Sequence, residues 1–200
     1  MESLLGDTLR TKKGATVGTR AALKDARFVL VYCSAHWCPP CKLFTPELGS
    51  FVTAHAARLG IKTVFLSNDR DPASFTAYFA TMAWDLALSP EDDAGPALMS
   101  RFGVRGIPAL LLFTASGALV TARAREELSA DPAGARFPWV WGGDALGRRV
   151  SLKGLVSRAD LNGKGGVVEG AVEKTARFNV RLTLGGDVIA VKRECFDFVD

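Results

Sequence analysis

Two cysteines separated by two prolines, in the segment Trp37-Cys38-Pro39-Pro40-Cys41, lie between an apolar run and a helical pattern. Residues 28–33 are almost wholly apolar, which is typical of a strand buried on both faces. From residue 44 onward, apolar residues recur at helical spacing. A Cys-x-x-Cys pair at such a strand-to-helix junction predicts a redox-active dithiol.

The position of Cys38 favours its thiolate. Cys38 would stand at the helix N-terminus, where unpaired backbone N–H groups and the helix dipole stabilise an anion. Cys41 follows one turn later and can form a disulfide with Cys38. Pro39 and Pro40 fix φ without requiring amide donors in the first turn, and Lys42 adds a nearby cation.

A metal site and a purely structural disulfide are the alternatives for this pair. Structural zinc needs two more ligands, and the spare candidates do not form a zinc spacing. Residues 1–14 contain an acid and no apolar core, so we expect no export signal and a reducing compartment, where structural disulfides are rare. We therefore expect no metal, with Cys33 buried in a strand. The spare candidates are Cys33, His36, His55 and Cys195.

The chain up to about residue 123 alternates strands and helices. Strands are expected at 61–66, 108–113 and 118–122, with a helix opening at Asp71-Pro-Ala-Ser, so a mixed sheet flanked by helices is predicted. Gly106-Ile107-Pro108 opens the third strand, where a proline is tolerated. We expect a cis Ile107–Pro108 bond, which would set backbone groups beside the cysteines.

The helical period disappears after about residue 148. Short strands are predicted at 152–157, 167–172, 178–183 and 188–192, separated by glycine-rich turns. This pattern favours a small all-β barrel of SH3-like type. We therefore divide the chain into a first domain, 1–147, and a second, 148–200.

Charge and hydropathy exclude two classes of partner. The 200 residues include 25 basic and 21 acidic side chains, a net charge of +4 that is scattered and gives no specific nucleic-acid signal. No apolar run approaches the roughly 18–20 residues that span a bilayer.

Four segments, 31–48, 75–84, 102–113 and 121–139, together resemble the tryparedoxin and nucleoredoxin branch of the thioredoxin superfamily. The resemblance implies a thioredoxin fold for the first domain. It also implies a nucleophilic Cys38, a resolving Cys41 and a cis Pro108 facing them. Trp37 would shield the disulfide, and Arg125 would lie near the substrate groove.

The sequence departs from the wider superfamily in two places. Thioredoxins carry a buried aspartate six residues before the nucleophile, and Tyr32 occupies that position here. Tryparedoxins use acidic residues after the second strand to meet the polyamine of trypanothione. Here the stretch is Ser67-Asn-Asp-Arg70, so a cation takes one of the expected acidic places and would repel a polyamine.

These observations predict a protein-disulfide reductase that cycles between the Cys38–Cys41 dithiol and its disulfide. No nicotinamide or flavin motif is evident, so we expect no cofactor, disulfide-containing protein substrates and an external thiol donor. The expected location is the cytoplasm or the nucleus. The alternative function is a redox-gated adaptor whose barrel recruits a partner, with turnover incidental; the partner of the barrel is not identified by the sequence.

Overall fold

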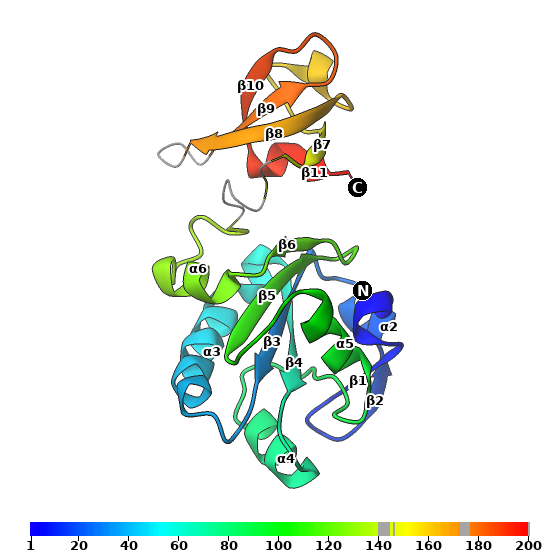
Figure 1. Ribbon diagram of the computed structural model, residues 1–200, viewed down its shortest axis with the longest axis vertical. Helices are drawn as coiled ribbons and strands as arrows, with labels where there is room; N and C mark the ends of the chain where they lie inside the picture. Colours follow the sequence, from blue (N-terminus) through cyan, green and yellow to red (C-terminus); the bar gives the residue numbers. More distant parts are fainter. Residues whose placement is uncertain (140–144, 146, 173–176, 200) are drawn as a thin grey trace. The chain divides into compact units, whose positions relative to one another are not determined.

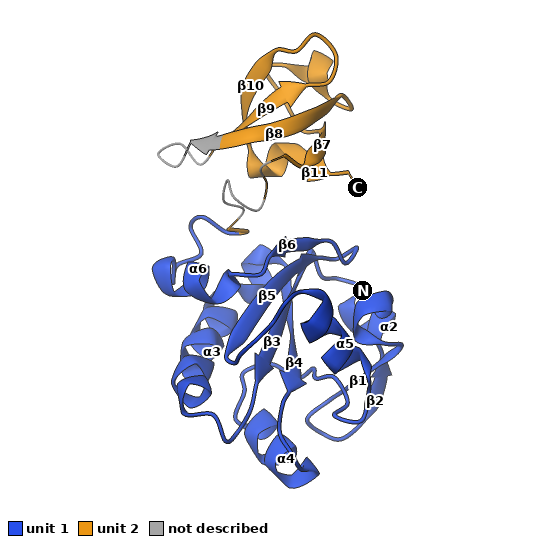
Figure 2. Ribbon diagram, viewed as in Figure 1, with its two compact units in different colours: residues 1–137 blue, residues 138–200 orange. Residues whose placement is uncertain are grey.

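The chain forms two compact units, Met1–Phe137 and Pro138–Asp200, in a computed structural model (Figure 2). The structure describes residues 1–139, 145, 147–172 and 177–199. The division falls ten residues before the predicted boundary at 147. Residues 140–144 and 146, next to that predicted boundary, lie outside the described residues.

A four-stranded mixed sheet forms the centre of the first unit (Figure 1). Its strand order is β4-β3-β5-β6, with β3 parallel to β4 and antiparallel to β5. This is the predicted mixed sheet. The strands are β3 (Phe28–Ser34), β4 (Ile61–Ser67), β5 (Ala109–Thr114) and β6 (Leu119–Thr121).

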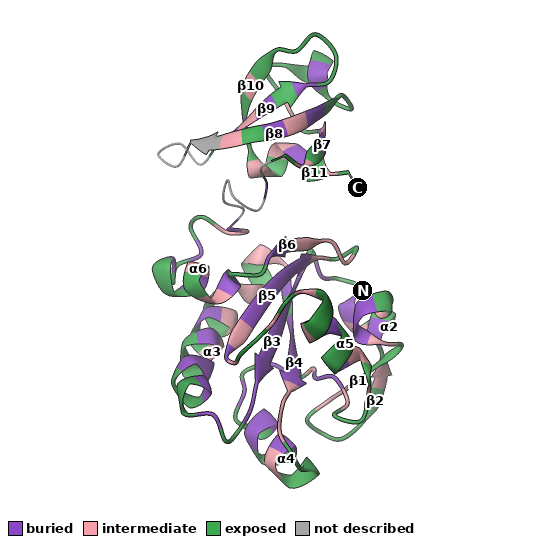
Figure 3. Cartoon of the chain, viewed as in Figure 1, coloured by how far each residue is buried: buried purple, intermediate pink, exposed green. Residues whose placement is uncertain are grey.

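Helices cover both faces of this sheet, which explains why β3 is apolar at nearly every position (Figure 3). Val29, Val31 and Cys33 face a cluster that includes residues of α1 and α5. The alternate residue Tyr32 contacts Phe44 of α3, with ring centroids 5.8 Å apart. The helices are α1 (Glu2–Leu5), α2 (Thr19–Leu23), α3 (Pro39–Leu59), α4 (Pro72–Ala80), α5 (Ala94–Arg101) and α6 (Ala124–Ala130).

Helix α3 carries the two cysteines, and its ends are set by local sequence. It begins with Pro39 and Pro40, whose fixed φ and missing N–H suit a first turn. It ends at Gly60, which adopts a left-handed φ of 70° and donates its N–H to the Ala56 carbonyl. The helix therefore starts directly after the carboxyl end of β3.

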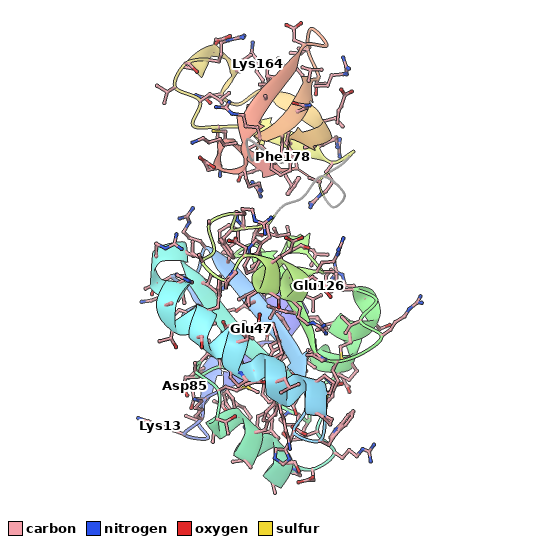
Figure 4. The ribbon with its side chains drawn as sticks, turned by 90° about the vertical axis from the view of Figure 1, so that its left-hand side faces the viewer. Lys13, Glu47, Asp85, Glu126, Lys164 and Phe178 are labelled. Atoms are coloured by element: carbon pink, nitrogen blue, oxygen red, sulfur yellow. The ribbon has the colours of Figure 1, made fainter. Side chains whose placement is uncertain are left out.

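The outer border of β4 is hydrogen-bonded to an extended segment, Leu86–Leu88. Phe65 donates its N–H to Leu86 O (2.9 Å), and Leu88 donates to Phe65 O (2.8 Å). Arg10 pairs with Ala87 from the other side. Asp85, labelled in Figure 4, accepts a hydrogen bond from the Lys12 N–H at 2.9 Å. Arg10 belongs to the hairpin of β1 (Thr8–Arg10) and β2 (Thr16–Gly18), so the segment is paired with β4 on one side and with this hairpin on the other.

The second unit is an antiparallel sheet with strand order β10-β9-β8-β7-β11. Its buried residues include Val150, Val168, Val180 and Phe196. This agrees with a small β module, and its SH3-like type stays a prediction. The strands are β7 (Arg149–Leu152), β8 (Gly165–Val172), β9 (Arg177–Leu182), β10 (Val188–Lys192) and β11 (Phe196–Phe198), with short 3-10 helices at Ala159–Leu161 and Arg193–Cys195.

The predicted strand at 152–157 is wrong. Strand β7 occupies Arg149–Leu152 instead, and the chain leaves the sheet after Leu152. Gly154 has a φ of 62°, a left-handed conformation that ends an extended run. Within the described residues, no helix is long and apolar enough to cross a membrane.

Candidate active site

Cys38 and Cys41 lie at the amino end of α3, immediately beyond the carboxyl end of β3. Cys38 is the N-cap residue, and its carbonyl accepts hydrogen bonds from the N–H groups of Cys41 (3.1 Å) and Lys42 (3.2 Å). The Cys38 side chain is 4% exposed, whereas Cys41 is fully buried. Both are free thiols. Both cysteines are therefore buried, but Cys38 keeps a small exposed fraction and Cys41 has none.

The loop before β5 lies against the outer thiol. The Ile107–Pro108 peptide bond is cis, as predicted. The Cys38 Sγ lies 3.8 Å from the Ile107 carbonyl oxygen, and Ile107 packs against Ala35, Cys38 and Cys41. Arg125, at the start of α6, donates from Nη1 to the Pro108 carbonyl at 3.3 Å. The structure therefore brings Cys38, Ile107, Pro108 and Arg125 together.

Trp37 forms an exposed rim beside Cys38. The residue is 51% exposed, and its Nε1 donates to the Asn68 carbonyl at 3.1 Å. The guanidinium of Arg70 lies over the indole, 5.5 Å from the ring centroid. Pro39 and Pro40 are also exposed. Trp37 is thus held in place by the loop that follows β4.

Burial gives Cys41 a higher pKa than an ordinary thiol has. Desolvation, together with a smaller effect of a hydrogen bond with Cys38, raises the pKa of Cys41 to about 11. The Ser34 hydroxyl and the Ala35 backbone oppose this rise by hydrogen bonding. Cys41 therefore stays protonated at neutral pH. Burial likewise raises the pKa of Cys33 to about 12, which agrees with the expected core position of that residue.

A cluster of buried hydroxyl groups lies behind Cys41. Thr45 Oγ1 donates to the Cys41 carbonyl at 2.9 Å and is hydrogen-bonded to the hydroxyls of Tyr32 (2.9 Å) and Tyr78 (2.5 Å). The Tyr78 hydroxyl continues to Ser34 Oγ at 3.1 Å. Burial raises the pKa of Tyr32, so its phenol is neutral. Hydroxyls therefore lie next to Cys41, and one of them belongs to Tyr32, at the position where thioredoxins carry a buried aspartate.

Tyr32 was noticeable in the sequence as a departure from the superfamily, whereas its partners Ser34, Thr45 and Tyr78 were not. Thr45 lies four residues after Cys41, so helical spacing places the two on one face. Tyr78 is 33 residues farther along the chain, and only the packing of α4 against the sheet brings it near. A cavity of about 460 Å³ adjoins the cluster; its lining includes His36, Lys42, Thr45 and Tyr78.

Of the remaining candidates, His36 borders the site, whereas His55 and Cys195 lie elsewhere. His36 is exposed, and its backbone N–H donates to Asp69. His55 lies within α3, where one ring nitrogen is 3.2 Å from the Pro132 carbonyl oxygen. Cys195 is half-buried in the second unit. Among the described residues, no group of three or more side chains has the arrangement of a metal site.

A paired dithiol at a helix N-terminus, on a mixed sheet and beside a cis-proline loop, defines a thioredoxin-fold thiol–disulfide oxidoreductase. Residues 25–119 match the family described as Thioredoxin-like. Tryparedoxin of Trypanosoma brucei brucei is 40% identical over 114 residues, covering 56% of this chain and 78% of the relative. The chain belongs to the thioredoxin-like family, on its tryparedoxin and nucleoredoxin branch.

The likeness extends over the first unit. Native tryparedoxin I from Crithidia fasciculata superposes with a TM-score of 0.65 at 37% identity, covering 70% of this chain and 96% of that one. Nucleoredoxin of Danio rerio is 37% identical over 140 residues, or 69% of this chain. The match spans only 32% of that nucleoredoxin's length.

Proposed function

We propose that this chain reduces protein disulfides, with Cys38 as the nucleophile and Cys41 as the resolving thiol. The single observation that carries these roles is the asymmetry of the pair. Cys38 is the N-cap residue of the helix and keeps a small exposed fraction, while Cys41 lies within the first turn and is fully buried with a raised pKa. A helix N-terminus stabilises a thiolate, which is the attacking form of cysteine.

The reaction consists of two exchanges. The Cys38 thiolate attacks one sulfur of the substrate disulfide and forms a mixed disulfide, and the first substrate thiolate leaves and takes up a proton. Cys41 then gives up its proton and attacks the Cys38 sulfur, expelling the second substrate thiolate. Two electrons pass to the substrate, and the protein is left with a Cys38–Cys41 disulfide. An external thiol donor returns it to the dithiol by the reverse exchanges.

The loop before β5 offers a place for an extended substrate. The β3–β5 ladder begins at Ala109, so Ile107 lies outside it. In the described part of the chain, no backbone group pairs with Ile107, and its carbonyl accepts only from the Cys38 thiol, which loses that proton when it becomes the attacking thiolate. A substrate segment can therefore hydrogen-bond to the Ile107 backbone while its disulfide meets Cys38. Trp37, Pro39 and Pro40 border the same surface, and Arg125 supports the Pro108 carbonyl.

Three variants test the roles of the cysteines in the reduction of a neutral peptide disulfide. Cys38→Ser should abolish reduction. Cys41→Ser should accumulate a mixed disulfide at Cys38, which mass spectrometry detects and dithiothreitol releases. Cys195→Ala, a cysteine change in the second unit, should retain the rate of the unmodified chain. A mixed disulfide at Cys41 in Cys38→Ser, with sustained turnover, would reverse the assignment.

We also propose what reduces the Cys38–Cys41 disulfide after each turnover and in which cellular compartment the protein acts. We expect an external thiol to be the sole reductant, with no bound cofactor, and we expect the cytoplasm or the nucleus as its location. A soluble dithiol such as dithiothreitol should therefore sustain turnover without added nucleotide or flavin.

A further inference from the structure

We propose that Arg70, held over Trp37, recognises a carboxylate next to the substrate disulfide, so that the protein prefers disulfides flanked by Asp or Glu. This rests on the proposed function and specifies its substrate class. The observation behind it is that the Arg70 guanidinium lies over the ring of Trp37, the residue that precedes Cys38.

Arg70 lies over the ring of Trp37. Trp37 is anchored by the hydrogen bond from its Nε1 to the Asn68 carbonyl. The guanidinium is 5.5 Å from the ring centroid, within the range of a cation–π contact. A guanidinium in such a contact still has N–H donors that can bind both oxygens of a carboxylate.

The neighbouring acids do not occupy these donors. Asp69 accepts hydrogen bonds from the His36 N–H (2.7 Å) and from Ser67 Oγ (2.8 Å). Asp71 caps α4 and accepts from the N–H and hydroxyl of Ser74. Within the residues that the structure describes, Arg70 has no ion pair or hydrogen bond. Its charge therefore remains available to an incoming group.

Two more cations lie close to the dithiol. Lys42 follows Cys41 and is exposed, and Arg125 is hydrogen-bonded to the Pro108 carbonyl beside Cys38. Neither forms an ion pair in the described part of the chain. A carboxylate carried by the substrate would be attracted here, whereas a substrate amine would face the Arg70 guanidinium.

Three cyclic peptides with the same disulfide test this preference. They differ only in two flanking residues, which are Glu, Gln or Lys. The fully reduced, full-length protein is mixed with each peptide, and the second-order rate of its oxidation is measured. We expect the order Glu, Gln, Lys, with Glu faster than Lys by about fivefold to twentyfold, since exposed charge contacts contribute up to about 1 kcal/mol each. High salt should compress the ratio.

Arg70→Glu should bring the Glu-to-Lys rate ratio to one or below. Arg27→Glu is the matched control, because Arg27 is also exposed and lies over an aromatic ring, that of Phe28, at 6.0 Å. Arg27 precedes β3, whereas Cys38 follows the other end of that strand, roughly 20 Å away. This control should keep the ratio of the unmodified chain.

The outcomes separate the two proposals. Equal rates for the Glu and Lys peptides, or an unchanged ratio in Arg70→Glu, would overturn carboxylate recognition and leave the reductase intact. Failure of the unmodified chain to reduce any of the peptides would overturn the proposed function, and this inference with it.

Discussion

Cys38 and Cys41 are three positions apart in the sequence but occupy different environments. The raised pKa of Cys41, about 11, keeps it protonated across the neutral range, because ionisation there requires a charge in a desolvated position. Iodoacetamide should therefore modify Cys38 first in the reduced protein at pH 8. Labelling of Cys41 should increase only as the pH approaches 11, as followed by peptide mass spectrometry.

Cys33 provides an internal reference for that experiment, because burial raises its pKa to about 12. It should react no faster than Cys41 at any pH at which the protein remains folded. Faster modification of Cys41 than of Cys38 at pH 8 would contradict the assignment of the nucleophile.

Thr45 joins the buried hydroxyls to the Cys41 backbone. Thr45→Val keeps the shape of the side chain but leaves the phenols of Tyr32 and Tyr78 without this partner. Buried polar groups that lose a hydrogen bond cost about 1–3 kcal/mol, so urea unfolding should show a loss of that size. Ser50→Ala, on the exposed side of the same helix, should change stability by less than about 0.5 kcal/mol. Equal effects of the two changes would argue against a stabilising role for the cluster.

At the residue scale, the spacing of the cysteines was sufficient to predict where the dithiol lies. The hydroxyl cluster was not predictable in the same way. Thr45 and Tyr78 lie among apolar helix positions, where a single polar atom leaves no periodic signal. Their function as partners depends on the packing of α3 and α4 against one face of the sheet.

Gly60 ends the helix that carries the active site. Its φ of 70° disfavours any side chain, and an added Cβ would lie 2.8 Å from the Arg27 side chain. Gly60→Ala should therefore lower the unfolding free energy by about 1–2 kcal/mol, measured by urea titration. Gly18→Ala is the control, since Gly18 has a φ of −63° and no atom within 4 Å of the added Cβ. A loss in Gly18→Ala as large as that in Gly60→Ala would contradict this explanation.

Elements were predictable where their pattern was long. The strand at residues 28–33 is a continuous apolar run, and the helix that follows shows several repeats of its period. No element was predicted before residue 28, because β1 and β2 are three residues each and α1 and α2 little longer. A strand this short shows no alternation. The misplaced strand at 152–157 has a local cause, the left-handed Gly154.

The whole chain combines a catalytic unit with a second unit of unassigned partner. Every residue placed at the candidate site belongs to Met1–Phe137, and Cys195 is the sole cysteine among the described residues of Pro138–Asp200. A fragment of residues 1–147 should therefore reduce a model disulfide within a few-fold of the full chain. The assay is the initial rate with dithiothreitol as the donor.

The fragment also distinguishes the reductase from the adaptor alternative. A loss of rate as large as that of Cys38→Ser would show that the second unit takes part in the redox cycle. The all-β character of this unit was predictable from the loss of helical period, whereas its partner was not, since recognition depends on surface chemistry that the pattern does not reveal.

The backbone hydrogen bonds along the outer edge of β4 affect the tendency of the protein to aggregate at high concentration. A bare strand border is a template onto which a second chain can add, and repeated addition leads to fibrils. Here residues 86–88 are hydrogen-bonded to that edge of β4. Arg10 is hydrogen-bonded to the outer edge of this segment in turn. On the opposite border, β6 is only three residues long. Among the described residues, neither edge of the four-stranded sheet offers a long free strand, so the fold of the first unit disfavours strand addition between copies of the chain or onto an extended segment.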